Sequence, residues 1–191
     1  MSNFTPSSTA EMVFSNAETK QLLVDILQHN ISFPSNGRNT LLLYGSFGSG
    51  KTTYANIFFN EYEKSYNGST ALVENVFVDG SEGIAKTIDR LNNIASLIPF
   101  NHSNKHYFLF DEVDGYKTVQ QQRLKSWMNR EHIVCVMTTN HIQRIDKGLR
   151  SRCFEVEFNA STNMYDYVQR MKQIIQQYKM PMLSDESLYQ I

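Results

Sequence analysis

The sequence predicts an α/β protein built on a parallel β-sheet, and two observations carry this prediction. Short apolar segments alternate with longer segments whose apolar residues recur at helical spacing. This alternation is typical of β-α-β units, in which helices cover both faces of a parallel sheet. In addition, residues 45–52 match the phosphate-loop pattern G-x-x-x-x-G-K-[ST] at every fixed position. We therefore expect a P-loop fold with a five-stranded parallel sheet.

In the first half of the chain, apolar residues at helical spacing predict helices over 17–29, 52–64 and 83–97. Continuous apolar runs of strand length predict strands over 40–44 and 73–79. The first strand therefore leads directly into the glycine-rich loop, and the second helix begins where that loop ends. This order of strand, loop and helix is the context that the phosphate-loop pattern requires.

In the second half, apolar runs predict strands over 106–111 and 132–138, and a helical pattern covers 118–130. Alternation of apolar and polar residues predicts a fifth strand over 152–158. Two further helical patterns, over 162–179 and 184–191, follow without another strand between them. They indicate a helical appendage to the sheet domain.

The chain is expected to divide into three parts. Residues 1–16 begin with a Ser/Thr-rich stretch and are expected to be a disordered lead-in. Residues 17–159 are expected to form the nucleotide-binding domain, and residues 160–191 the helical appendage.

The overall composition excludes some classes of protein. The chain is 41% hydrophobic with a net charge of −1, so any contact with nucleic acid must come from a local patch. No stretch is long and apolar enough to predict a membrane span, and the first residues lack the pattern of a secretory signal. Cys135 and Cys153 are expected to be free thiols in a reducing, cytoplasmic setting.

The glycine-rich loop predicts a site for the phosphates of ATP. Glycines allow backbone N–H groups to turn towards phosphate oxygens, and the helix that follows adds its partial positive charge. Lys51 is expected to reach the β- and γ-phosphates, and the Thr52 hydroxyl to ligate Mg²⁺. The expected nucleotide-binding residues are Gly45, Gly48, Ser49, Gly50, Lys51, Thr52 and Thr53.

A second part of the site is predicted where the strand over 106–111 ends in carboxylates. Asp111 is expected to hold Mg²⁺ through water, and Glu112 to orient and partly deprotonate the attacking water. An acidic strand end alone is usually a solvated turn. Together with the loop over 45–52, however, it favours ATP hydrolysis.

Three polar residues near later strand ends each have two interpretations. Asn140 could contact both the γ-phosphate and the attacking water, or it could cap a turn. Arg150 and Arg152 precede the last strand. Either could project into the phosphate site of a neighbouring subunit, or both could be ordinary surface arginines.

Together these motifs resemble the AAA+ ATPases. Within that superfamily they resemble the small ATPase subunits of sliding-clamp loaders, of both the cellular replication-factor-C type and the phage type. The resemblance spans residues 41–158 and depends on the loop over 45–52, the D-E-x-D-like strand end over 111–114, the glutamine-led helix over 121–128 and the S-R-C box over 151–153. Residues 78–81 also resemble the stretch after the family's second strand. The chain departs from the family at Lys125 and Asn129, where the family helix has Arg and Glu, and it lacks the family's basic opening.

The resemblance implies a three-layer AAA+ domain followed by an incomplete helical lid, because residues 160–191 match about the first half of one. It implies a Mg²⁺-dependent ATPase acting in DNA replication. Such subunits assemble with AAA+ neighbours and act on a sliding clamp and primer–template DNA. In this role Asn140 is a sensor, Arg152 acts on ATP held by the next subunit, and Gln121 couples DNA contact to the acidic strand end.

Two alternatives stay open at this point. One is another DNA-acting AAA+ ATPase, such as a helicase loader or a branch-migration motor. The other is a module that binds ATP as an assembly signal without hydrolysing it. Five basic residues on two helices would contact DNA phosphates or simply face solvent: Lys86, Arg90, Arg123, Lys125 and Arg130.

Overall fold

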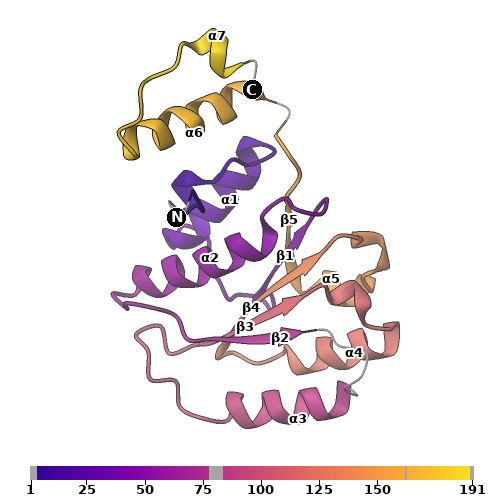
Figure 1. Ribbon diagram of the computed structural model, residues 1–191. Helices are drawn as coiled ribbons and strands as arrows, with labels where there is room; N and C mark the ends of the chain where they lie inside the picture. The colour runs from indigo at the N-terminus through magenta and orange to yellow at the C-terminus, as the bar shows by residue number, and fades with distance from the viewer. Residues whose placement is uncertain (1–3, 78–83, 162, 190–191) are drawn as a thin grey trace.

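The computed structural model describes residues 4–77, 84–161 and 163–189. The described residues form a three-layer arrangement in which helices cover both faces of a parallel sheet with strand order β2-β3-β4-β1-β5 (Figure 1). The strands are β1 (Thr40–Tyr44), β2 (Val73–Phe77), β3 (His106–Asp111), β4 (Ile133–Thr139) and β5 (Cys153–Glu157). The helices are α1 (Ala17–Leu27), α2 (Lys51–Ser65), α3 (Ile84–Ala95), α4 (Thr118–Trp127), α5 (Lys147–Arg150), α6 (Met164–Gln177) and α7 (Asp185–Leu188).

Two apolar cores hold the layers together, one on each face of the sheet. In β1, Leu41 and Leu43 pack into the core shared with α1 and α2, whereas Leu42 packs into the core shared with α3 and α4. All three side chains are fully buried. A central strand buried on both faces is the reason that β1 reads as a continuous apolar run rather than an alternating one.

The predicted fold class is confirmed, and two of the predicted strands, over 40–44 and 106–111, have the expected bounds. The other strands and the helices lie within a few residues of their predicted positions, and the one-turn helix α5 was not expected. Residues 78–83, which include the end of the second predicted strand and the stretch over 78–81, lie outside the described residues.

The N-terminal segment differs from the expected disordered lead-in. Residues 4–16 run along the α1 and α2 layer and include a short 3₁₀ turn over Thr9–Glu11. Thr9 is buried, and its backbone N–H and hydroxyl both donate to the Glu61 carboxylate of α2. Phe14 packs edge-on against Tyr54 and Phe158. Ser/Thr-rich composition suggested disorder, but these long-range contacts order the segment.

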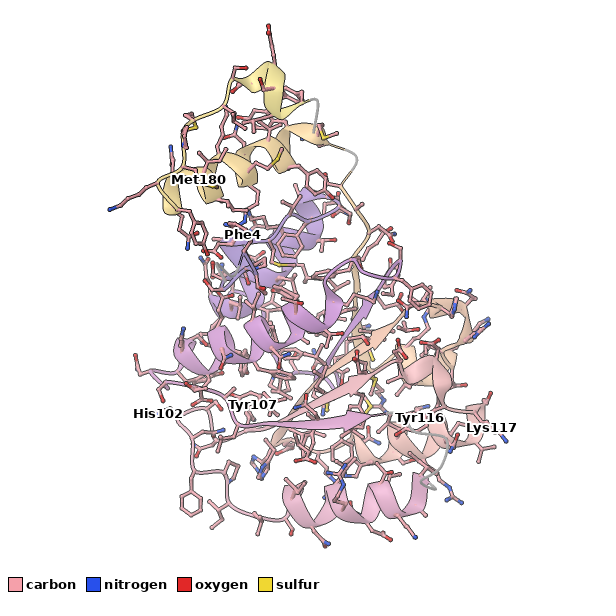
Figure 2. The ribbon with its side chains drawn as sticks, viewed as in Figure 1. Phe4, His102, Tyr107, Tyr116, Lys117 and Met180 are labelled. Atoms are coloured by element: carbon pink, nitrogen blue, oxygen red, sulfur yellow. The ribbon has the colours of Figure 1, made fainter. Side chains whose placement is uncertain are left out.

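Helices α6 and α7 lie beyond the α1 and α2 layer and share a small apolar cluster of their own (Figure 1). Two contacts connect α6 and its C-terminal end to the N-terminal segment. The Arg170 guanidinium lies 3.2 Å from a Glu11 carboxylate oxygen. The Phe4 ring meets the Tyr178 ring edge-on at a centroid separation of 4.9 Å, beneath α6 (Figure 2). The division into a sheet domain and a partial lid stays a prediction.

Composition predicted free thiols and no membrane span. Cys135 and Cys153 are both free and buried, and burial raises the pKa of each thiol. In the part of the chain that the structure describes, no helix has the length and apolar character needed to cross a bilayer.

Candidate nucleotide-binding site

The glycine-rich loop connects the carboxyl end of β1 to the first turn of α2. Gly50 has a φ of 90° and supplies the N-cap of α2, a left-handed position that glycine adopts without the steric cost of a Cβ. Because Gly50 has no side chain, it cannot cap the helix, and the backbone N–H groups of residues 51–53 have no helical acceptor. These donors, together with the helix dipole, form an anion-binding position.

Gly45 is required at the start of the loop because the chain passes very close to the segment that follows β5. A Cβ at Gly45 would lie 2.1 Å from the Phe158 carbonyl oxygen. The next residue, Ser46, donates its backbone N–H to the Asn159 side-chain oxygen at 3.0 Å. Contacts with Phe158 and Asn159, just after β5, therefore fix the position at which the loop begins.

The Lys51 side chain folds back across the loop. Its ammonium group donates to the carbonyl oxygens of Gly45 and Ser46 at 3.1 and 2.7 Å, and to the Ser49 hydroxyl at 3.3 Å. Burial lowers the pKa of Lys51, and the carboxylates over 111–114 oppose that shift. The ammonium is thus held in the loop by weak carbonyl acceptors that phosphate oxygens can replace.

The acidic strand end lies beside this loop, as the sequence predicted for Asp111. The Thr52 hydroxyl donates to Asp111 Oδ1 at 3.0 Å, and the Thr138 hydroxyl donates to the same oxygen at 2.5 Å. The side chains of α2, β3 and β4 thereby meet at one point on the carboxyl edge of the sheet. A hydroxyl and a carboxylate at this spacing are oxygen ligands of the kind that Mg²⁺ binds, directly or through water.

The backbone of Glu112 and the carboxylate of Asp114 are also held in place. Glu112 has a left-handed backbone with φ of 57°, which costs a non-glycine residue about 1–2 kcal/mol. Its N–H donates to the Thr138 hydroxyl at 3.0 Å, which stabilises this turn. Asp114 accepts from the Thr139 hydroxyl at 2.6 Å. The exposed Glu112 side chain is left free to face the loop.

These parts surround a cavity of about 280 Å³. The described lining residues are Phe47, Gly48, Ser49, Gly50, Lys51, Thr52, Thr53, Asp111, Glu112, Thr138 and Asn140. Most of the expected site residues thus share one cavity; Gly45 and Arg152 are not among the described residues that line it. Among the described residues, no group of three or more His, Cys, Asp or Glu side chains could hold a metal. A Mg²⁺ ion here would need phosphate and water oxygens in addition to Thr52 and Asp111.

A larger cavity of about 470 Å³ lies between the N-terminal segment and α6. Met12 lines this cavity, and its methyl group lies 3.5 Å from the position that a Cβ would take on Gly50. Met12 therefore lies near the phosphate loop, although none of the described loop residues lines the larger cavity.

Arg152 is on the opposite edge of the sheet, just before β5, and far from the loop of its own chain. Arg150 makes a bidentate ion pair with Glu155, with nitrogen–oxygen distances of 2.9 and 2.8 Å. The two arginines that the sequence left equivalent are therefore different: Arg150 is paired within its own chain, and Arg152 is not paired within the described residues.

Gln121 is fully engaged inside the protein. Its side-chain nitrogen donates to the carbonyl oxygens of Tyr116 and Arg144, and its oxygen accepts from the Asp146 N–H. With 1% exposure it cannot contact DNA directly. It instead joins the turn after the acidic strand end to the segment that leads into α5.

Two of the five basic residues on α3 and α4 are bonded to other side chains of the protein. Arg90 is paired with Glu74, and Arg130 donates to the Asn92 side chain at 2.6 Å. Lys86 and Arg123 are exposed. The contact of these helices with DNA stays a prediction.

Sequence reasoning missed three side chains that hold the site together: Thr138, Thr139 and Asn159. Each acts through a hydrogen bond to a residue on another element, and Thr and Asn at strand ends are too common to be signals by themselves. Thr138 and Thr139 directly precede Asn140, so their place on the strand next to β3 was the one available clue.

The fold and the loop define this chain as a P-loop protein of the AAA+ α/β type. The family model described as "ATPase family associated with various cellular activities (AAA)" matches residues 41–162. The chain belongs to this AAA family of ATPases. No curated protein sequence matches the chain.

Two solved structures illustrate the likeness of fold. The structure of C. elegans PCH-2 is 14% identical with a TM-score of 0.57, and the match covers 88% of this chain and 50% of that one. The crystal structure of the FIGL-1 AAA domain in complex with ADP is 16% identical with a TM-score of 0.60, covering 91% and 62%. This chain thus spans about half to three-fifths of these proteins. At such identities the likeness concerns the fold alone, so the resemblance to clamp-loader subunits depends on the sequence motifs.

Proposed function

We propose that this chain binds and hydrolyses ATP as the ATPase subunit of a DNA sliding-clamp loader. The observation that carries the ATPase part is the 3.0 Å hydrogen bond from Thr52 to Asp111, which joins the phosphate loop to the acidic strand end within one cavity. In this proposal the N–H groups of residues 51–53 and the Lys51 ammonium hold the β- and γ-phosphates.

The carboxylates then have separate tasks. The Thr52 hydroxyl and Asp111 would hold Mg²⁺, which neutralises charge on the phosphate oxygens when it is bound with the nucleotide. Glu112 orients the attacking water and accepts its proton, while Asn140 contacts the water and the γ-phosphate. Phosphoryl transfer depends mainly on such positioning and charge neutralisation, which is why a rigidly held strand end suits it.

The rest of the nucleotide would occupy the cavity of about 470 Å³ between the N-terminal segment and α6. The position of Met12, whose methyl group lies 3.5 Å from where a Cβ on Gly50 would be, supports this assignment. The FIGL-1 AAA domain, which has a similar fold, was solved with ADP. Nucleotide binding would then connect α6 to the sheet domain in the manner of a lid.

The position of Arg152 supports assembly with AAA+ neighbours. It lies at the edge of the sheet opposite the phosphate loop and has no ion-pair partner in the described part of the chain. We assign it to the ATP of the next subunit, where an arginine supplied from outside stabilises transition-state charge.

The clamp-loader assignment rests on the S-R-C box and the glutamine-led helix, and an apolar surface supports it. Leu97, Ile98 and Phe100, the apolar tip, are 65%, 77% and 98% exposed in the loop between α3 and β3. Large apolar side chains that are exposed close together in the sequence are suited to a protein contact. In this proposal they meet the sliding clamp.

ATP turnover by the wild type and by Glu112→Gln tests the enzymatic part. We expect Glu112→Gln to bind ATP with wild-type affinity and to lose turnover by about 10²–10⁴-fold, the usual contribution of general base catalysis. Lys51→Ala serves as the control that loses binding as well. Equal turnover of Glu112→Gln and wild type would leave only a module that binds ATP as an assembly signal.

The partner is tested by stimulation of turnover. A clamp-loader subunit should hydrolyse ATP faster with a sliding clamp and primer–template DNA together, and Phe100→Ala should lose the clamp effect while keeping basal turnover. Stimulation by a replicative helicase in place of a clamp would instead favour a helicase loader.

A further inference from the structure

A second arginine lies beside Arg152 on the amino edge of the sheet. Arg38 precedes β1 and Arg152 precedes β5, and these two strands pair so that Thr40 lies opposite Cys153. Both arginines line the same two cavities, of about 590 and 550 Å³. The chain therefore brings together two arginines that are far apart in the sequence.

Specific local features hold both guanidinium groups. The Arg38 guanidinium lies over the Phe154 ring at 5.6 Å from its centroid. The turn that carries Arg38 is closed by two backbone hydrogen bonds between Ser35 and Arg38, of 3.0 and 2.8 Å. A Cβ on Gly37, within that turn, would lie 2.5 Å from Arg152 Nη1. The glycine therefore allows the Arg152 guanidinium to lie directly against the Arg38 turn.

The charges of this pair are not neutralised within the described part of the chain. Neither Arg38 nor Arg152 forms an ion pair there, in contrast to Arg150 with Glu155. The other described charged residues lining the two cavities are Lys105, Lys125, Arg130 and Glu131. Two adjacent guanidinium groups that are not paired with a carboxylate are suited to bind phosphate oxygens, which match their planar fork of donors.

The cavity at the carboxyl edge of the sheet, which contains the phosphate loop, has few positive charges. Lys51 is the one Lys or Arg among its described lining residues, although ATP would bring several negative charges there. Arg38 cannot serve the loop of its own chain. The seven residue-to-residue steps from Arg38 to Gly45 run along β1 and span about 23 Å at about 3.3 Å per step, which exceeds the length of an arginine side chain. A head-to-tail contact between copies would bring the two edges together.

We propose that Arg38 and Arg152 together bind the terminal phosphate of ATP that is held in the phosphate loop of a second copy of this chain. Arg38 supplies a second guanidinium group, positioned by Phe154, next to that of Arg152. This inference rests on the proposed ATPase function and adds to it a phosphate-contacting residue that the motifs did not indicate.

The test compares Arg38→Ala with the wild type, and uses Arg90→Ala as the matched control because Arg90 is exposed on α3 and paired with Glu74. Three quantities are measured: binding of a fluorescent ATP analogue, ATP turnover, and self-association with ATPγS by sedimentation. We expect Arg38→Ala to bind the analogue like the wild type, to turn over ATP about tenfold more slowly, and to self-associate about tenfold more weakly with ATPγS. Arg38→Lys should recover part of both losses. Phe154→Leu, which removes the ring under Arg38, should lower both ATP turnover and self-association, as Arg38→Ala does.

Each other outcome has a definite meaning. Turnover and self-association of Arg38→Ala equal to wild type would overturn the inference and leave the ATPase proposal intact. A wild type that binds ATP but neither hydrolyses it nor self-associates would overturn both. If Arg38→Ala and Arg152→Ala lose binding to duplex DNA but self-associate and turn over ATP normally, the arginine pair is a nucleic-acid contact and the inference is wrong.

Discussion

At the scale of single residues, the Thr138 hydroxyl connects the Asp111 carboxylate to the backbone of Glu112. It donates to Asp111 Oδ1 and accepts the N–H of Glu112. One hydroxyl thus fixes the orientation of the proposed metal-holding group and the left-handed turn that presents the proposed base. Thr138 is 1% exposed, so we expect it to act on turnover by positioning these two residues.

We predict that Thr138→Val lowers turnover about tenfold with little change in ATP affinity, because a displaced carboxylate loses alignment with its water. The unpaired Glu112 N–H should also destabilise the fold by about 1–2 kcal/mol. Steady-state kinetics and urea unfolding measure the two effects. Thr40→Val is the matched control, since it removes another buried strand hydroxyl, bonded to Asn39 far from the site. A turnover loss in Thr40→Val equal to that in Thr138→Val would mean that the effect is one of stability alone.

The contrast between Thr138 and its neighbours shows how much of the site the sequence could predict. Lys51, Thr52 and Asp111 belong to patterns with fixed spacing and a defined strand context, so they were found directly. Thr138 and Asn159 act through hydrogen bonds across strands that are adjacent only in the folded sheet. Their residue types carry no signal without the strand order, which the sequence did not provide.

At the scale of elements, α2 extends from the phosphate loop to the opposite end of the sheet. Glu63, in its last turns, accepts hydrogen bonds from the N–H groups of His102 and Ser103 and from the Tyr107 hydroxyl. Figure 2 shows Tyr107 and His102 at the end of the sheet opposite Tyr116 and Lys117. The buried Glu63 carboxylate therefore anchors the loop that carries the apolar tip to the same helix that begins at the phosphate site.

This anchor predicts a pH-dependent stability. Burial raises the pKa of Glu63, but hydrogen bonds from Tyr107, Ser103 and His102 outweigh it, so the pKa lies below its ordinary value of 4.5. The ionised carboxylate therefore stabilises the fold above that value, and the contribution is lost as the pH falls through the lowered pKa. Glu63→Gln should cost about 1–3 kcal/mol at pH 7, and the difference from wild type should shrink towards pH 3. Urea unfolding at both pH values measures it, with the exposed Glu18→Gln as the control. A difference independent of pH would contradict the ionised anchor.

The N-terminal segment shows where composition misleads at this scale. Its Ser/Thr content suggested disorder, whereas Phe14 lies 7% exposed between Tyr54 and Phe158. Strands and helices with strong periodicity were predicted well because the pattern is local. The segment was not, because its partners lie about forty and more than a hundred residues away in the sequence.

We predict that Phe14→Ala destabilises the protein by about 3–5 kcal/mol, the cost of truncating a buried aromatic ring. Phe100→Ala, at 98% exposure, is the matched control and should change stability by less than about 0.5 kcal/mol. Thermal and urea unfolding of both variants provide the comparison. Equal stability of Phe14→Ala and wild type would mean that the segment is held only loosely.

At the scale of the whole molecule, the sheet separates two complementary edges. The carboxyl edge presents the phosphate loop and the acidic strand end, and the amino edge presents Arg38 and Arg152. The S-R-C resemblance suggested a role for Arg152 in a neighbouring subunit. It could not reveal that Arg150 forms an ion pair with Glu155. Nor could it reveal that Arg38 lies beside Arg152, because that placement depends on the pairing of β1 with β5.

Because the phosphate loop and Arg152 lie on opposite edges of the sheet, two inactive variants should restore activity to each other when they are mixed. Lys51→Ala and Arg152→Ala should each lack ATP turnover when alone, for different reasons: the first cannot hold ATP, and the second cannot assist a neighbour. In an equal mixture, an interface is productive when the loop comes from Arg152→Ala and the arginine from Lys51→Ala. Random assembly in a head-to-tail arrangement therefore predicts about one quarter of wild-type turnover. The control is an equal mixture of Lys51→Ala with Glu112→Gln, in which both defects lie in the same cavity and no interface is productive. If the first mixture stays as inactive as this control, Arg152 does not act between subunits, and the two arginines must bind a different ligand.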